Sequence, residues 1–298
     1  MAYGPEAITK AARLIRAGQP VAMPTETVYG LAADATNGEA AARIYEAKGR
    51  PSFNPLIVHV RDLAQATEIA AFDDEARALA ERYWPGPLTL VLPLRDGAPI
   101  ASLVTAGLPS VALRVPAHPA MQALLAATER PLAAPSANAS GRISPTRAEH
   151  VLASLGGRIR LIVDAGQTAH GLESTIVALT GDAPRLLRPG PLDLGLTVAA
   201  DGMIEAPGQL RSHYAPEKPV RLNAADARPD EWLIGFGALT GNATLSASGD
   251  LVEAAAKLFE MLHEAELSPA RRIAVAPIPE TGLGVAINDR LRRAAAPR

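Results

Sequence analysis

The sequence predicts an α/β protein in which helices pack against a central sheet. Short runs of branched apolar residues, for example at 56–60, 88–92 and 110–115, alternate along the chain with segments whose apolar residues recur at helical spacing. With 48% hydrophobic and 20% charged residues, the composition is that of a globular protein rather than a disordered or fibrous one. The length of 298 residues allows one large domain with a smaller one beside it.

The elements of the larger unit follow in order. A helix is predicted from 5 to 18, because proline favours its first turn, glycine favours its end, and the apolar residues between them recur at helical spacing. The strand at 21–23 leads into the polar cluster Thr25-Glu26-Thr27, a pattern typical of a functional loop. The other predicted elements are helices at 38–48, 62–71 and 73–83, and strands at 56–60, 88–92, 110–115, 132–134, 161–163, 174–177 and 185–188.

The periodicity is interrupted near residue 207. The segment 207–219 contains several prolines and no clear period, so we interpret it as a linker. Beyond it we expect a small α/β unit with strands at 220–222, 232–234 and 273–276 and helices at about 250–263 and 285–295. The predicted domains are therefore 1–206 and 220–298, joined by the linker 207–219.

The composition excludes several chemistries. Because the chain has no cysteine, it cannot form disulfides, thiolate nucleophiles, iron–sulfur clusters or cysteine-ligated zinc sites. A formal net charge of −2 argues against binding nucleic acid through a global positive field. No stretch reaches the roughly 18 apolar residues of a membrane span. A cytoplasmic enzyme without a membrane partner is expected.

The densest polar cluster spans residues 48–56. Lys48 and Arg50 lie next to a glycine and two prolines, which predicts a rigid cationic loop suited to phosphate oxygens. Only four of the 29 basic residues are lysines, so a lysine at this position is informative. An ordinary helix end, in which Lys48 only complements the helix dipole, explains the same residues.

A second cluster spans residues 135–146, between a predicted strand and a predicted helix. Its hydroxyls, amide and cation occupy the usual position of ligand contacts in α/β folds, which favours an anion or nucleotide loop. The alternative is local: Ser144 can be a helix N-cap with Pro145 in the first turn.

Ionisable residues also occur inside apolar strands. Ser110, Ala112 and Arg114 should share one strand face, and a buried Arg114 requires an anionic partner. Arg188 raises the same question, although its strand end could expose it. His59, in another apolar strand, has the pattern of a hydrogen-bonded core residue. The six histidines are scattered without metal-binding spacing.

These segments, in this order, resemble the threonylcarbamoyl-AMP synthase family, whose catalytic part is a YrdC-like domain. The linker followed by a small α/β unit resembles the longer, two-domain form of the family. The matching segments are Pro24-Thr25-Glu26-Thr27-Val28-Tyr29-Gly30-Leu31, Lys48-x-Arg50-Pro51-x-x-Asn54-Pro55-Leu56, Trp84-Pro85-Gly86-Pro87-Leu88-Thr89, Arg114-Val115-Pro116, Pro135-Ser136-Ala137-Asn138, Ser140-Gly141-x-x-Ser144-Pro145-Thr146, Ser174-Thr175-Ile176-Val177, Arg188-Pro189-Gly190 and His213-Tyr214-Ala215-Pro216.

The resemblance implies an enzyme that joins L-threonine, bicarbonate and ATP into L-threonylcarbamoyl-adenylate and releases pyrophosphate. The product feeds the N6-threonylcarbamoyl modification of tRNA, which a separate transferase completes. The resemblance also implies a twisted mixed sheet with flanking helices, followed by a small Rossmann-like α/β C-terminal domain. Mg²⁺ would accompany ATP, held mainly by its phosphates, and direct tRNA binding would be weak at most.

The resemblance further implies a role for individual residues. The residues expected to contact ATP are Arg50, Asn54, Ser110, Ser136, Ser144, Arg188 and, from the linker, Tyr214. Those expected to hold threonine are Thr27, His59, Arg114, the backbone at Ala134, and Ser174. Lys48 and Asn138 complete the phosphate side and, with Arg50, make up the expected catalytic set. Ala178 stands where many relatives carry an acid, so a role for an acid there stays open.

The chemistry agrees with these roles. A threonine carbamate and ATP are both anionic, so positioning and charge neutralisation should dominate catalysis and no protein nucleophile is required. Arg114 can pair with the threonine carboxylate. We further expect that Tyr214 closes over ATP and shields the labile adenylate, so that deleting residues after about 206 uncouples ATP hydrolysis from product formation.

Two other functions are compatible with parts of the sequence. YrdC-like domains have a concave basic surface that can accept RNA, but the acidic balance and the lack of an aromatic-rich strand platform argue against RNA binding as the main role. A carbamoyl-adenylate enzyme of hydrogenase maturation uses a related domain. That function would require carbamoyl phosphate and usually has accessory zinc-finger and acylphosphatase segments, for which this cysteine-free chain has no room.

Overall fold

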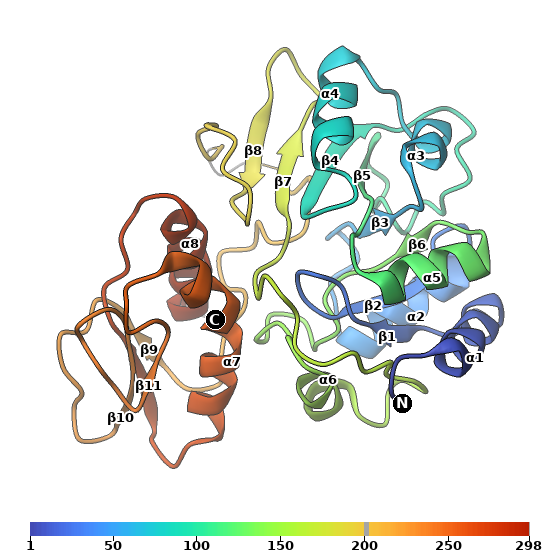
Figure 1. Cartoon of the computed structure of the whole chain (residues 1–298). Coiled ribbons are helices and arrows are strands. Elements are labelled where there is room, and N and C mark those ends of the chain that lie inside the picture. Colours follow the sequence, from blue (N-terminus) through green and yellow to red (C-terminus); the bar gives the residue numbers. More distant parts are fainter. Residues whose placement is uncertain (200–202, 298) are drawn as a thin grey trace.

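A computed structural model describes residues 1–199 and 203–297. A large N-terminal domain is built on an eight-stranded mixed sheet, and a small C-terminal domain is built on a four-stranded sheet (Figure 1). The predicted α/β fold, a mixed sheet with flanking helices followed by a small α/β unit, is confirmed. No helix in the described ranges combines the length and hydropathy of a membrane span.

The large domain contains six helices and eight strands within the described residues. The helices are α1 (Pro5–Arg16), α2 (Gly38–Lys48), α3 (Leu63–Ile69), α4 (Asp74–Tyr83), α5 (Pro119–Thr128) and α6 (Ala148–Leu155). The strands are β1 (Val21–Met23), β2 (Gly30–Asp34), β3 (Ile57–His59), β4 (Leu88–Pro93), β5 (Ser110–Arg114), β6 (Leu132–Ala133), β7 (Thr175–Ala178) and β8 (Arg185–Arg188). Their order in the sheet is β1-β2-β6-β3-β5-β4-β7-β8, with β3–β5 and β4–β7 parallel and the other pairs antiparallel.

Local signals explain where several helices begin and end. Helix α2 starts at Asn37, whose side chain accepts hydrogen bonds from the backbone N–H groups of Glu39 and Ala40, and it ends at Gly49 in the left-handed conformation. Asp62 and Asp73 cap α3 and α4 in the same way. These caps satisfy N–H groups that a helix start leaves without partners.

The structure corrects some sequence expectations. Strand β2 and helix α5 were not predicted: β2 consists mainly of small residues, whereas Pro119 at the start of α5 was a usable signal. The strand expected at 161–163 is only an isolated bridge between Ala22 and Ile162. Ser144 is not the N-cap of the following helix, because α6 begins after Arg147.

The faces of the large sheet determine where a ligand can bind. One core joins β2, β3, β4, β5 and β7 to α2, α3, α4 and α6. On the other face, α1 and α5 cover one end, and a segment containing Ala206 covers the other. Strand β5 shows the alternation: Val111 and Leu113 belong to the first core, whereas Ala112 and Arg114 face the other side, as predicted.

The C-terminal domain contains α7 (Leu251–Leu267), α8 (Leu283–Ala295), β9 (Val220–Arg221), β10 (Glu231–Gly235), β11 (Ala243–Thr244) and β12 (Arg272–Val275). Its strands pair in parallel in the order β11-β10-β12-β9. Helices α7 and α8 lie on the side of this sheet that faces the large domain (Figure 1). Residues 207–219 form neither helix nor strand, yet Tyr214 is buried in the C-terminal core beside Phe259.

A pair of histidines joins the two domains. The ring of His150 on α6 stacks on that of His263 on α7, with 3.7 Å between centroids, and Nε2 of His263 lies 3.1 Å from the carbonyl oxygen of Ser144. Beside them, Nε of Arg147 donates to the carboxylate of Glu260 at 2.7 Å. Burial and then the charge of Arg147 lower the pKa of His150 to about 4, and burial with the neighbouring ring lowers that of His263 to about 3.

Acid should therefore weaken the folded state through this pair. Between pH 6.5 and 4 the unfolded chain protonates both rings while the folded chain does not, so the free energy of unfolding should fall as the pH falls and level off below the folded pKa values. Urea denaturation at pH 7 and pH 5 measures the effect. The double variant His150→Gln/His263→Gln should lose less stability between these pH values than the native chain, and an equal loss would contradict the prediction.

Candidate active site

A small cavity of about 40 Å³ lies on the less covered face of the large sheet, beneath the linker. Strands β3 and β5, the loops after β1 and β6, the segment before β7, the end of β8 and the linker all contribute to it. The lining residues are Thr25, Thr27, Val28, Gly30, Arg50, Ile57, His59, Arg114, Ala134, Pro135, Ser136, Glu173, Ser174, Arg188, Pro207, His213 and Tyr214.

The cavity brings together most of the residues that the sequence singled out. Every residue expected to hold threonine lines it: Thr27, His59, Arg114, Ala134 and Ser174. Of the residues expected to contact ATP, the lining includes Arg50, Ser136, Arg188 and Tyr214. The other expected residues are absent from this lining: Lys48, Asn54, Ser110, Asn138 and Ser144.

Arg114 is held by contacts within the chain. Its Nη2 donates to Oε1 of Glu26 at 2.5 Å, Nη1 donates to Oγ1 of Thr27 at 2.9 Å, and Nε donates to the carbonyl oxygen of Gly86 at 3.1 Å. The anionic partner expected for a buried Arg114 is therefore Glu26, in an almost fully buried ion pair. A guanidinium has five N–H groups, so these bonds leave donors for a ligand.

The environment keeps Glu26 ionised. Burial alone would raise the pKa of this carboxyl group, but the charge of Arg114 and its hydrogen bond outweigh burial and lower the pKa to about 2. Next to this pair, burial and then the charge of Arg114 lower the pKa of His59 to about 3, so its ring is neutral at physiological pH. Nδ1 of His59 is buried without a hydrogen-bond partner among the described residues.

Two more arginines face the same cavity. Nη2 of Arg50 donates to Oδ1 of Asn54 at 2.6 Å and to the carbonyl oxygen of Pro55 at 2.8 Å. Arg188 donates through Nε to the carbonyl oxygen of Ser174 and through Nη2 to its hydroxyl, both at 3.0 Å. Burial is the largest effect on both groups, and it lowers the pKa of Arg50 to about 10 and that of Arg188 below its usual value. The guanidinium of Arg50 therefore stays charged at neutral pH.

Lys48 and Asn138, which were expected to complete the phosphate side, bond to the loop that follows β6. Nζ of Lys48 donates to the carbonyl oxygens of Ser136 at 2.5 Å and Asn138 at 2.6 Å, and Oδ1 of Asn138 lies 3.4 Å away. Nδ2 of Asn138 donates to the carbonyl oxygen of Arg142 at 2.8 Å. A buried ammonium must find acceptors for its N–H groups, and the loop that follows β6 provides them. Both side chains therefore hold this loop in place.

The remaining expected residues are engaged elsewhere. Asn54 bonds to Arg50, and the hydroxyl of Ser144 donates to the carboxylate of Glu173. Ser110 pairs with Pro93 at the start of β5, whereas the cavity lies at the other end of that strand. Motif membership placed these residues near the site, but side-chain direction depends on contacts that the motifs do not reveal.

Three ionisable residues in or beside the cavity carry no clear signal in the sequence. Glu26, which pairs with Arg114, and Glu173, which lines the cavity, are carboxylates, which do not by themselves indicate a site for anionic ligands. His213 stands within a motif and lines the cavity, and burial lowers its pKa well below the usual value. Within residues 1–199 and 203–297, no group of three or more histidines and acids could hold a metal ion.

The fold and the cavity define a two-domain α/β protein in which three arginines line one cavity. A family model described as "Telomere recombination" matches residues 13–190, and one described as "Threonylcarbamoyl-AMP synthase, C-terminal domain" matches residues 189–296. The threonylcarbamoyl-AMP synthase of Bacillus subtilis is 40% identical, covering 98% of this chain and 93% of the relative, and that of Pyrococcus abyssi is 40% identical, covering 95% and 92%. The crystal structure of P. abyssi Sua5 complexed with L-threonine is similar over 99% of this chain and 96% of that chain, with 37% identity and a TM-score of 0.91.

The chain belongs to the threonylcarbamoyl-AMP synthase family. The family, the enzyme class and the activity expected from the sequence are thereby confirmed. Because residues 189–296 match the C-terminal domain of these synthases, the hydrogenase-maturation alternative finds no support in this part of the chain.

The Arg114–Glu26 pair predicts a large stability effect. Arg114→Met leaves a buried carboxylate without its partner, so unfolding should become easier by about 3–5 kcal/mol. Urea denaturation at pH 7.5 measures this. The double variant Glu26→Gln/Arg114→Met should lie closer to the native chain, and Arg61→Gln, which breaks an exposed pair, should leave the stability close to that of the native chain. A loss for Arg114→Met no larger than that of Arg61→Gln would contradict the prediction.

Proposed function

We propose that the cavity forms L-threonylcarbamoyl-adenylate and pyrophosphate from L-threonine, bicarbonate and ATP. The observation that carries the proposal is the gathering of Arg50, Arg114 and Arg188 around one cavity, where two anionic reactants have to meet. The names of the relatives and the threonine bound in the P. abyssi structure support the choice of substrates.

We assign the threonine side to the large domain. The free N–H groups of Arg114 would bind the carboxylate of the amino acid. The neutral ring of His59, the hydroxyl groups of Thr27 and Ser174, and the backbone at Ala134 would surround its side chain and amine. A site that offers hydrogen-bonding groups to a substrate hydroxyl discriminates against analogues that lack this hydroxyl.

We assign the ATP side to Arg50 and Arg188, with Ser136 and Tyr214 beside them. The threonine amine first combines with bicarbonate to give a carbamate and water. A carbamate oxygen then attacks the α-phosphorus of ATP, and the bond between the α-phosphorus and the bridging oxygen breaks to release pyrophosphate. Fixed positive charge that faces the developing negative charge lowers the barrier to such a step.

Two of the expected catalytic residues take a supporting role in this proposal. Lys48 and Asn138 fix the loop that carries Ser136, so they act by positioning that residue. Mg²⁺ commonly binds through substrate phosphates and retained water rather than through a protein cage. We therefore propose that it arrives with ATP and supplies charge neutralisation at the phosphates, which fits the lack of a cluster of histidines and acids in the described ranges.

The linker would close the site after ATP has entered. The cavity has room for only a few water molecules, so ATP requires a more open arrangement. Pro207, His213 and Tyr214 form the linker side of the lining, and closure would exclude water from the labile adenylate. The product would then pass to a separate threonylcarbamoyl transferase in the cytoplasm, with at most weak direct binding of tRNA.

The proposed reaction is tested by pyrophosphate release. With ATP, Mg²⁺ and bicarbonate, release should depend on L-threonine. Serine should support release with a kcat/KM at least about tenfold lower than that of threonine, because a methyl contact is lost. Carbamoyl phosphate should not replace bicarbonate. Release at the same rate with and without threonine would exclude the proposed activity.

Closure of the linker is tested at Gly208. This residue has a φ of +92°, and a Cβ there would lie 2.7 Å from the Tyr214 hydroxyl and 2.8 Å from Cδ of Arg188. Gly208→Ala should therefore hinder closure and raise the number of ATP molecules consumed per product. Gly107→Ala is a matched control, because Gly107 has a φ of +75° but open space around it. An unchanged ratio of ATP to product in Gly208→Ala would rule out closure by this segment.

A further inference from the structure

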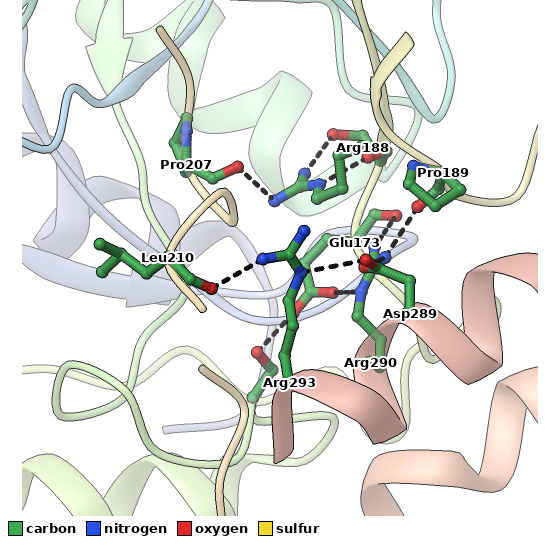
Figure 2. Close-up of polar contacts among 10 residues, drawn as sticks. Glu173, Arg188, Pro189, Pro207, Leu210, Asp289, Arg290 and Arg293 are labelled. Carbon is green, nitrogen blue, oxygen red and sulfur yellow. Dashed lines mark hydrogen bonds and ion pairs between the residues drawn. The ribbon is translucent and has the colours of Figure 1, made fainter. Parts of the chain in front are cut away.

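A fully buried arginine of the C-terminal domain reaches into the large domain (Figure 2). Arg290 on α8 donates through Nε to Oε2 of Glu173 at 2.9 Å and through Nη1 to the carbonyl oxygen of Pro189 at 2.8 Å. Its own neighbour Asp289 accepts a further bond from Nη1 at 2.9 Å. The guanidinium carbon lies 5.2 Å from the ring centre of Tyr214. Arg290 thus contacts both the large domain and the linker.

The contacts of Arg290 flank two residues of the cavity. Glu173 directly precedes Ser174, and Pro189 directly follows Arg188. Ser174 and Arg188 are themselves joined by hydrogen bonds from Nε and Nη2 of Arg188. The guanidinium of Arg290, which comes from the C-terminal domain, therefore bonds to both segments that carry this pair.

These two segments fit closely against each other. A Cβ on Gly190 would lie 2.4 Å from the backbone nitrogen of Thr175 and 2.8 Å from the carbonyl oxygen of Glu173, so only glycine leaves room for this contact. The carboxylate of Glu173 also accepts from the hydroxyl of Ser144. A shift of Glu173 would therefore reach the loop after β6 as well as Ser174.

Stability alone is a poor explanation for this network. Well-packed apolar residues often replace a buried ion pair at no cost in stability, because desolvation offsets much of the attraction between the charges.

The network continues toward the linker: Nε of Arg293 donates to Oδ1 of Asp289 at 3.0 Å, and its Nη1 donates to the carbonyl oxygen of Leu210 at 2.7 Å. Figure 2 shows Arg290 and Arg293 extending from the same helix toward these different partners.

We propose that Arg290 is a positioning residue for the ATP side of the active site. Acting through Pro189 it fixes Arg188, and through the ring of Tyr214 it fixes the linker above that residue. Through Glu173 it also supports Ser174, which belongs to the threonine side. The ATP side is thus assembled only when α8 is docked. Within residues 1–199 and 203–297, Arg290 makes no hydrogen bond to the Arg114–Glu26 pair or to His59. Threonine binding should therefore depend on Arg290 less than ATP binding does. This inference rests on the proposed function.

The test compares substitutions on one helix in the full-length chain. Arg290→Gln should raise the KM for ATP about tenfold or more, as expected when hydrogen bonds from a charged group are lost. The Kd for L-threonine, measured by calorimetry without ATP, should rise by a smaller factor than the KM for ATP, because Ser174 is only one of several groups proposed to hold threonine. Arg290→Lys retains the charge without the planar guanidinium, so its KM for ATP should lie between those of the native chain and Arg290→Gln. Arg292 lies on the same helix as Arg290 and forms an exposed ion pair with Glu280, which precedes the helix. Arg292→Gln should behave like the native chain.

The outcomes separate the inference from the proposed function. If the native chain shows no threonine-dependent pyrophosphate release, the proposed function fails. If the native chain is active and Arg290→Gln retains the native KM for ATP, or raises the KM for ATP and the Kd for threonine equally, the positioning role is overturned. Should Arg290→Gln not fold, Arg290→Lys decides in the same way: a native KM for ATP in that variant refutes the inference.

Discussion

Positive charge buried around one cavity is the constraint on which this structure depends. Arg50, Arg114 and Arg188 line the same small space, and each guanidinium is oriented by carbonyl, hydroxyl or carboxylate oxygens of the chain. Burying cations is costly unless acceptors surround them. Glu26 balances the charge of Arg114, whereas Arg50 and Arg188 bond mainly to neutral oxygens. The charge of these two arginines is therefore not neutralised by their hydrogen-bond partners.

The same constraint suggests a role for the second domain. The proposed threonine side lies in the large domain, where β3 and β5 place His59 and Arg114 next to each other in the sheet. The proposed ATP side includes Arg188 at the end of β8, where the linker contacts Arg188 itself and helix α8 contacts the following residue, Pro189. A nucleotide bound there would meet a surface to which the large domain, the linker and α8 contribute, which fits the proposed closure.

Much of the fold and part of the site were predictable from the sequence. Period and capping signals located most helices, and the alternation along 110–114 correctly placed Ala112 and Arg114 on one face. Strand β2 was missed because its small residues carry little pattern. Ser144 lies close to the site, but its hydroxyl bonds to Glu173, a partner distant in sequence that no local pattern reveals.

The sequence by itself determined the α/β class, the family and the cationic residues that we propose for the reaction, because periodicity and ordered motifs are local properties of the chain. Only the tertiary structure decided which of these side chains face the cavity. Lys48 turned toward the loop carbonyls, since a buried ammonium binds the nearest acceptors. Arg290 joined the site from more than one hundred residues away, because packing brings α8 against Glu173. Such partners are fixed by contacts between distant segments, and these contacts form only when the chain folds.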